Sequence, residues 1–445
     1  MEIVLIHGWS DKWESLRKVG DDLENIPGWR AHYINYNSLD NQAYYEDFAE
    51  GMHEKLMEKG LLNRGDRELH FITHSTGALV LRQWLKQYSW AKVAQKVGNV
   101  VFLAPANFGS PLAHKGSTLL GKLAKARKWG EDVGEVGEEI LRGLELASPF
   151  QWALAEFDLF GQAGTLYGGD KIRASVITGC KPYGGLRKFV NEDGTDGTIV
   201  VSGANLSSRK LTLNFVQRND VNDAEWFKSP LLPDLPFAIH NNLDHSSILE
   251  LKDDPDLRNQ VVLCLEVTDK TGYENLRTGF QKFSDVQTKD QDNYQQFIVR
   301  LLDDRGMAIN DYHMEFNVWD RRKIDLDGGK PKDGVEMSED EIGKSGQLDE
   351  MLRNNVHIHS AASYMRRFLI QPKKIDELLG NNFVVTMKID ADTNDDEIHY
   401  GTEKFENHLV YDPKSKEDPK LFFENTTTLV DVLVDRYSEL VTVHP

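Results

Sequence analysis

Short apolar runs and one helix-like segment dominate the first part of the chain. Residues 2–6 and 174–177 have the length and character of buried strands. Residues 68–72 form another strand-like run, and residues 78–85, which have helical spacing, follow it after a short turn. The pattern therefore predicts a strand, a sharp turn and a helix between residues 68 and 85.

The character of the chain changes near residues 253–256. Beyond them, short alternating runs are separated by acidic loops, and we expect these runs to be strands: 261–267, 294–302, 313–319 and 429–434. The sequence thus predicts two domains, a catalytic one at 1–255 and a mostly β, sandwich-like one at 256–445.

Composition agrees with a two-domain globular protein. The chain has 445 residues, of which 40% are hydrophobic and 28% charged. Its net charge of -19 argues against a nucleic-acid partner. Cys180 and Cys264 are too few for a disulfide framework. Met1 leads directly into a strand and no run of 18 apolar residues occurs, so we expect neither a signal peptide nor a membrane span.

The turn between the predicted strand and helix carries the most informative motif, Thr73-His74-Ser75-Thr76-Gly77. A serine on such a turn has its hydroxyl lifted above the sheet, as in a nucleophile elbow. Gly77 fits the G-x-S-x-G pattern, whereas Thr73 replaces its first glycine. We therefore take Ser75 as the candidate nucleophile.

A second turn, at His7-Gly8-Trp9, follows the strand at residues 2–6. A turn at this place can direct backbone amides at a reacting carbonyl. We expect the amides of Trp9, or its neighbour, and Thr76 to form an oxyanion hole. His7 is expected to be a structural residue of the turn, because the base comes late in the chain in this architecture.

An acid and a histidine follow Ser75 in the required order. Asp196 lies in an Asp-Gly-Thr sequence before an apolar run at 199–201, and Asp193 occurs in the same context three residues earlier. His245 lies in Asp-His-Ser at the start of an apolar segment, with His240 as the fallback. We predict that His245 is the general base and that Asp196 fixes its tautomer.

These motifs resemble those of lipase-like α/β-hydrolases, and the resemblance covers about the first 255 residues. The Thr-His-Ser-Thr-Gly turn, the Asp-Gly-Thr acid, the Asp-His-Ser histidine and the large carboxy-terminal region are similar to PlaB-type bacterial phospholipases A. The resemblance implies release of fatty acids from phospholipids and lysophospholipids at a membrane surface by Ser75, Asp196 and His245. It also implies a bacterial protein that forms homo-oligomers.

An insertion at about 106–170 is expected to form a helical cap or lid. Within it, residues 119–129 combine Lys122, Lys125 and Lys128 on one side of a helix with leucines on another. This segment fits an interfacial lid helix, or equally a solvated helix packed by its leucines. The apolar stretches 140–146 and 149–157 could line an acyl pocket or belong to the core.

Metal and cofactor signals are weak, and we expect neither. Residues 390–397 begin like a calcium loop but lack its glycine and its final glutamate. His357 and His359 share one face of a predicted strand without a third ligand. The second domain could bind membrane, bind substrate or mediate self-association, and the sequence leaves these three open.

The sequence as a whole predicts a serine ester hydrolase that acts on phospholipid or lysophospholipid and is cytoplasmic or peripherally bound to membrane. One alternative is a soluble carboxylesterase or lipase for simpler esters, which the same residues would serve. Another is a catalytically silent hydrolase fold used as a binding module, supported only by the imperfect elbow at Thr73.

Overall fold

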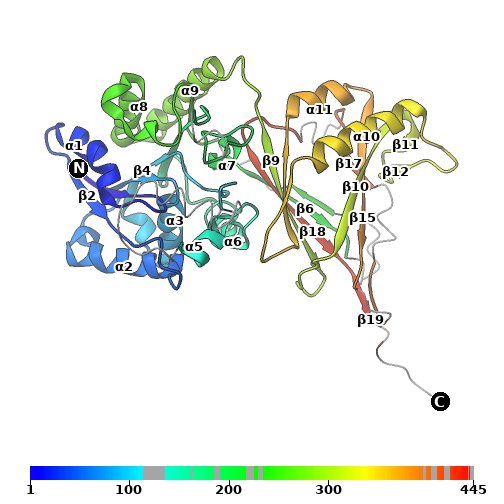
Figure 1. Ribbon diagram of the computed structural model, residues 1–445, viewed down its shortest axis with the longest axis horizontal. Coiled ribbons are helices and arrows are strands. Elements are labelled where there is room, and N and C mark those ends of the chain that lie inside the picture. Colours follow the sequence, from blue (N-terminus) through cyan, green and yellow to red (C-terminus); the bar gives the residue numbers. More distant parts are fainter. Residues whose placement is uncertain are drawn as a thin grey trace. The chain divides into compact units, whose positions relative to one another are not determined.

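The protein divides into two compact units (Figure 1). Unit 1 comprises Met1–Ser208 and Leu231–Asp292, and unit 2 comprises Arg209–Pro230 and Asn293–Pro445. The computed structural model describes residues 1–113, 136–161, 164–184, 191–216, 225–228, 234–393, 397–401, 408–414, 421–438 and 440. The predicted lid helix at 119–129 lies outside the described residues.

A six-stranded sheet with the order β2-β1-β3-β4-β5-β8 forms the centre of unit 1. All neighbouring strands in it are parallel. The strands are β1 (Glu2–Ile6), β2 (Arg30–Ile34), β3 (Leu69–His74), β4 (Val97–Leu103), β5 (Arg173–Gly179) and β8 (Phe237–His240). Every residue of β1, β3, β4 and β5 is buried, as expected for a sheet covered on both faces.

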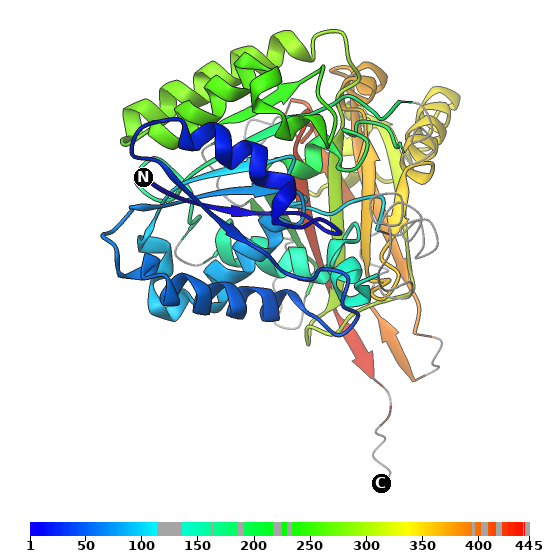
Figure 2. The ribbon, with the colours of Figure 1, turned by 60° about the vertical axis from the view of Figure 1, so that its left-hand side comes forward.

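Helices cover both faces of this sheet. Figure 2 shows α1 (Arg17–Glu24), α8 (Pro255–Glu266) and α9 (Lys270–Gln287) on one face, and α2 (Tyr45–Glu58) and α3 (Gly77–Gln87) on the other. Apolar side chains of α1, α8 and α9 join those of β1, β3, β4 and β5 in one buried cluster. Two further helices, α5 (Glu138–Leu144) and α6 (Pro149–Asp158), follow β4, and the short α7 (Val201–Ala204) follows β5. This is the α/β-hydrolase architecture that the sequence predicts.

The predicted strand at 261–267 is wrong, because these residues belong to helix α8. Asp254 caps the helix by accepting from the Leu257 amide, and Pro255 occupies the first turn, where its missing N–H is not needed. Leu257, Val261 and Leu265 then share one face at helical spacing and are buried in the unit 1 core. The helix cap and the packing of these side chains therefore favour a helix, although the composition of the segment is typical of a strand.

Unit boundaries also differ from the predicted division at 255/256. Helices α8 and α9 bury their apolar faces in the core of unit 1, so this unit extends to Asp292. Conversely, β6 (Arg209–Asn214) pairs in parallel with β18 (Thr427–Val434) and belongs to unit 2. A pairing between segments more than 200 residues apart leaves no local trace in the sequence.

Unit 2 is built mainly from two sheets. The larger is mixed, with the order β13-β14-β9-β18-β6-β7, and the smaller is antiparallel, with the order β10-β15-β17. The strands of the larger sheet not yet given are β7 (Glu225–Lys228), β9 (Gln295–Asp303), β13 (Val356–Ile358) and β14 (Met365–Ile370). Those of the smaller are β10 (Tyr312–Asp320), β15 (Phe383–Ala391) and β17 (His408–Tyr411). The predicted strands at 294–302, 313–319 and 429–434 are confirmed as β9, β10 and β18.

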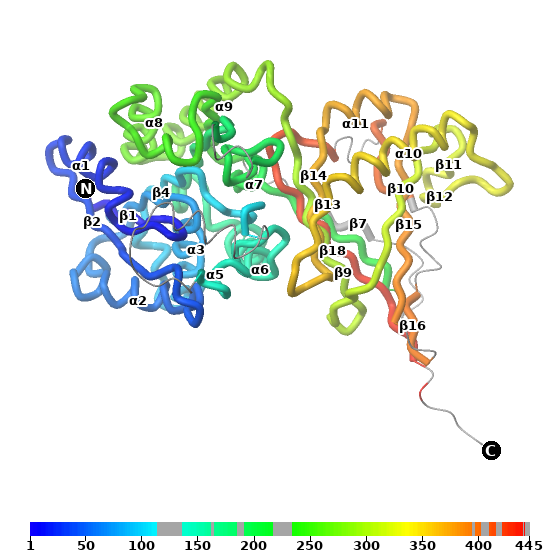
Figure 3. The backbone as a smooth tube through the Cα atoms, in the orientation of Figure 1, coloured from blue at the N-terminus to red at the C-terminus, as the bar shows by residue number. Residues whose placement is uncertain are grey.

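The two sheets of unit 2 share an apolar core. Side chains of β6, β9 and β18 meet those of β10 and β15 in one buried cluster, as in the predicted sandwich. Figure 3 shows helices α10 (Glu339–Arg353) and α11 (Pro372–Leu379) close to the upper ends of these strands. Two short pairs, β11 (Ile324–Asp325) with β12 (Lys330–Pro331) and β16 (Ile398–Tyr400) with β19 (Arg436–Ser438), complete the unit.

Two weak sequence signals fall in unit 2. The calcium-like segment 390–397 begins in the last two residues of β15, leads to β16 and lies partly outside the described residues. His357 belongs to β13, and His359 follows it. Within the described ranges, no group of three or more His, Cys, Asp or Glu side chains is arranged to hold a metal ion. No helix in these ranges is both long and apolar enough to span a membrane.

Candidate active site

Ser75 occupies a strained turn between β3 and α3. Its backbone φ angle is +55°, a left-handed conformation that residues other than glycine rarely adopt. Two glycines make room for this turn. A Cβ on Gly77 would lie 2.5 Å from the Ile6 carbonyl oxygen, and one on Gly8 would lie 2.8 Å from the Ser75 Cβ. The first close approach explains why position 77, two residues after Ser75, is a glycine, and the second explains why position 8 is one.

Thr73, which replaces the usual first glycine, lies inside β3, where it pairs with Ile6 of β1 and Phe102 of β4. It is fully buried, and a β-branched residue suits a strand. Ser75 and Gly77 therefore adopt the elbow conformation without a glycine at this place.

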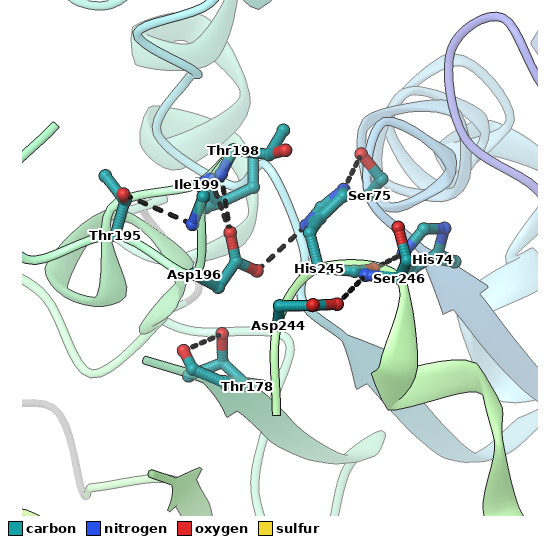
Figure 4. A network of polar contacts seen from close by, with 12 residues as sticks. His74, Ser75, Thr178, Thr195, Asp196, Thr198, Ile199, Asp244, His245 and Ser246 are labelled. Carbon is teal, nitrogen blue, oxygen red and sulfur yellow. Dashed lines mark hydrogen bonds and ion pairs between the residues drawn. The ribbon is translucent and has the colours of Figure 1, made fainter. Parts of the chain in front are cut away.

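His245 links Ser75 to Asp196 (Figure 4). The Nε2 atom of His245 lies 3.0 Å from the Ser75 Oγ, and its Nδ1 atom lies 2.8 Å from Asp196 Oδ2. All three side chains are buried or nearly so. Because a carboxylate accepts hydrogen bonds, Nδ1 carries the ring proton and Nε2 can accept from the serine hydroxyl. The structure thus brings together the three residues selected from the sequence.

Backbone groups hold Asp196 in place. Its Oδ1 accepts from the amides of Thr198 (2.9 Å) and Ile199 (2.7 Å), which leaves Oδ2 for His245. The Asp196 carbonyl also accepts from the His245 amide at 3.0 Å. The apolar run at 199–201 does not form a strand: Val200 makes one isolated bridge to Thr195, and α7 begins at Val201. A tight turn around Asp196 takes the place of a strand edge.

His74 is a part of this arrangement that the sequence reasoning missed. It is buried, and its Nε2 donates to the His245 carbonyl at 3.0 Å. The two imidazole rings lie 4.7 Å apart between centroids. The residue before the serine therefore fixes the backbone of the loop that carries His245. The sequence feature that could have indicated this role is the position of His74 directly before the candidate nucleophile.

The alternatives considered from the sequence lie elsewhere. Asp193 is exposed. His240 ends β8, where its Nε2 is 2.9 Å from Gln260 Oε1, and burial lowers its pKa. His7 stacks on Tyr36 at 4.2 Å, and its Nε2 accepts from the Tyr36 amide. His7 thus lies in the turn after β1, where a structural role is expected.

A small cavity opens beside the Ser75 hydroxyl. Its volume is about 80 Å³, and Trp9, Thr76 and His245 line it together with Ser75. Among the described residues, the backbone amides of Trp9 and Thr76 have no hydrogen-bond acceptor. An apolar wall of the cavity is formed by Leu141 and Leu144 of α5, Leu112, Ala113 and Ile199. The cavity thus combines amide donors near the hydroxyl with an apolar wall from the predicted insertion.

A buried ion pair connects α3, which follows Ser75, to α6 of the insertion. Arg82 and Asp158 are both fully buried and form two hydrogen bonds of 2.7 and 3.0 Å. Tyr167 donates to Asp158 Oδ2 at 2.8 Å, and Arg82 donates to the Asn107 carbonyl at 2.9 Å. Burial, and then the Asp158 charge, raise the pKa of the Tyr167 hydroxyl well above its usual range. This network fixes α6 relative to the helix that follows Ser75.

Comparison with solved structures identifies one architecture that spans the whole chain. The phospholipase PlaB from Legionella pneumophila matches with a TM-score of 0.79 at 19% identity, covering 100% of this chain and 97% of that one. The fold is that of PlaB. The complex of PlaB with thio-NAD matches with a TM-score of 0.74 at 18% identity, covering 100% of this chain and 98% of that one. No family model matches the sequence, and no curated protein matches it.

Proposed function

We propose that the protein is a serine hydrolase that releases fatty acids from phospholipids and lysophospholipids through an acyl-enzyme. The observation that carries the proposal is the contact chain from Ser75 Oγ through His245 to Asp196, with distances of 3.0 and 2.8 Å. A strained serine with a histidine and a buried acid in this geometry suits acyl transfer.

In the proposed reaction, Ser75 Oγ attacks the ester carbonyl while His245 Nε2 takes the hydroxyl proton. The negative charge that develops on the carbonyl oxygen is stabilised by the amides of Trp9 and Thr76, which have no described acceptor of their own. Asp196 stabilises the imidazolium. His245 then gives the proton to the departing alcohol, and the fatty acyl group stays on Ser75.

Water completes the cycle. His245 takes a proton from the water as it attacks the acyl carbonyl, and returns it to Ser75 Oγ as the bond to the serine breaks. The products are a fatty acid and a regenerated hydroxyl.

Two observations support a phospholipid substrate. The fold of the phospholipase PlaB extends over both units, not only over the hydrolase unit, and α5 contributes two leucines to an apolar wall beside Ser75. Peripheral membrane contact and homo-oligomers accompany this proposal as predictions. The cavity volume of about 80 Å³ favours a second candidate, the hydrolysis of simpler soluble esters by the same residues.

The experiment is fatty-acid release from vesicles of phosphatidylcholine and lysophosphatidylcholine by the wild-type protein and by Ser75→Ala, beside a short-chain p-nitrophenyl ester. We expect release from both lipids that falls by about 10⁴-fold or more in the variant. Ser15→Ala, in the short 3-10 helix Trp13–Leu16 and outside the residues that line the cavity, serves as the control and should retain full activity. Cleavage of the soluble ester alone would favour a carboxylesterase. No turnover of any ester would favour a binding module.

A further inference from the structure

Unit 2 contains a second cavity, between its two sheets. Its volume is about 90 Å³, and every side chain that lines it is apolar or aromatic. The larger sheet contributes residues such as Val299 and Phe368, the smaller sheet residues such as Met314, and α10 contributes Leu348 and Leu352. A cavity with such a lining offers water few hydrogen-bonding partners, so an apolar group is its natural occupant.

The cavity lies near the edge of the apolar core. Several of its lining side chains are only partly buried although they belong to the edge of the apolar core: Phe297, Phe316, Leu352, Phe368, Val410 and Leu421. Only a short distance therefore separates the apolar lining from solvent. The volume admits only part of a long chain, which favours an occupant of medium length.

One arginine lies at the edge of this apolar space. Arg366 of β14 is directly opposite Val299 of β9, a lining residue, and it shares a sheet face with Phe368, another lining residue. Its guanidinium carbon lies 3.6 Å from the centre of the Tyr312 ring of β10, across the space between the sheets. The arginine is therefore on the inner side of the sandwich.

Arg366 is only partly buried, but part of its guanidinium is enclosed without a hydrogen-bond acceptor. Its Nε is buried without a hydrogen-bond acceptor. Among the described residues, no Asp or Glu forms an ion pair with it, whereas other unit 2 arginines such as Arg300 and Arg321 have carboxylate partners. Buried donors in native proteins are nearly always satisfied, and a planar guanidinium favours a carboxylate.

We propose that the unit 2 cavity binds a medium-chain fatty acid, with its chain among the apolar side chains and its carboxylate on Arg366. The apolar lining accounts for the chain and the unpaired arginine for the acid group. This site is separate from the Ser75 cavity and does not require Ser75 to be catalytic, so its test is independent of the proposed hydrolysis.

The test is calorimetric titration of the full-length protein with decanoate, and with decan-1-ol as the neutral ligand of equal chain length. Two variants address the site. Arg366→Gln removes the proposed carboxylate partner, and Leu352→Trp fills the cavity. Arg353→Gln removes one exposed charge from the end of α10 and serves as the matched control. Circular dichroism checks that each variant is folded.

We expect saturable binding of decanoate to the wild-type protein, weakened about tenfold in Arg366→Gln and unchanged in Arg353→Gln. Decan-1-ol should bind more weakly than decanoate and with equal affinity to the wild-type protein and Arg366→Gln. Leu352→Trp should abolish this binding event. Absence of saturable binding, equal decanoate affinity in Arg366→Gln, or retention of the event in folded Leu352→Trp would overturn the proposal.

Discussion

The cavity at Ser75 and the cavity in unit 2 differ in the groups that surround them. The cavity at Ser75 is lined by polar and apolar groups together, and buried hydrogen bonds and one buried ion pair hold its surroundings in place. The unit 2 cavity is lined by apolar and aromatic side chains, and Arg366 stacks on Tyr312 beside it. Polar groups at fixed positions suit a reaction, whereas an apolar lining suits the retention of a chain.

The largest expected effect is a loss of hydrolysis that leaves ligand binding in the unit 2 cavity unchanged. Asp196→Asn should lower kcat for ester hydrolysis on the order of 10³-fold or more, because the amide no longer holds the His245 tautomer or stabilises the imidazolium. Decanoate binding in unit 2 should be unchanged. Steady-state kinetics and calorimetry on the same preparation measure both.

Asp193→Asn is the control for this change, since Asp193 precedes a Gly-Thr pair as Asp196 does but is exposed. It should leave kcat unchanged. If both variants lost activity equally, the distinction between the two aspartates would be wrong.

A smaller effect concerns the buried ion pair between α3 and α6. Asp158→Asn should lower the free energy of unfolding by about 3–5 kcal/mol, because it leaves Arg82 buried without its counter-charge. Urea denaturation measures this loss. Asp170→Asn, which breaks an exposed pair with Lys270, should change the free energy of unfolding by less than about 1 kcal/mol. Similar values for the two variants would mean that the buried network does not stabilise unit 1.

The smallest effect is a pH dependence within unit 1. Burial lowers the pKa of His70, in β3, to about 4. The unfolded chain therefore takes up this proton first as the pH falls, and stability is lost between about pH 6.5 and pH 4. Between pH 7.5 and pH 5, the loss due to this residue should be roughly 2 kcal/mol.

Urea denaturation of wild-type protein and His70→Gln at these two pH values tests the assignment. The variant should show a smaller difference between them, whereas His313→Gln, at an exposed position in unit 2, should behave like the wild-type protein. An unchanged pH dependence in His70→Gln would exclude His70 as its source.

The sequence was most informative where local pattern and chemistry coincide. The strand-turn-helix around Ser75 and the order of Ser75, Asp196 and His245 could be predicted because each lies in a short motif with a physical reason. The β3 strand, α3 and the contact chain through His245 are all present. The catalytic role of these residues stays a prediction for the experiments above.

The features that could not be predicted from the sequence depend on packing between segments that are far apart in the chain. The apolar run of α8 resembles a strand, and only its cap at Asp254 and its burial beside β4 make it a helix. Strand β6 is separated from its partner β18 by more than 200 residues, so the limits of the two units could not be predicted locally. The contact of His74 with the His245 carbonyl likewise depends on a loop 171 positions away.

The most direct test of the central claim is intact-protein mass spectrometry after exposure to a fluorophosphonate probe. The account predicts one adduct per chain, located by peptide mapping at Ser75, with much slower labelling in His245→Gln and none in Ser75→Ala. Absence of an adduct on the folded wild-type protein, or an adduct of equal yield in Ser75→Ala, would contradict the assignment of Ser75 as the nucleophile.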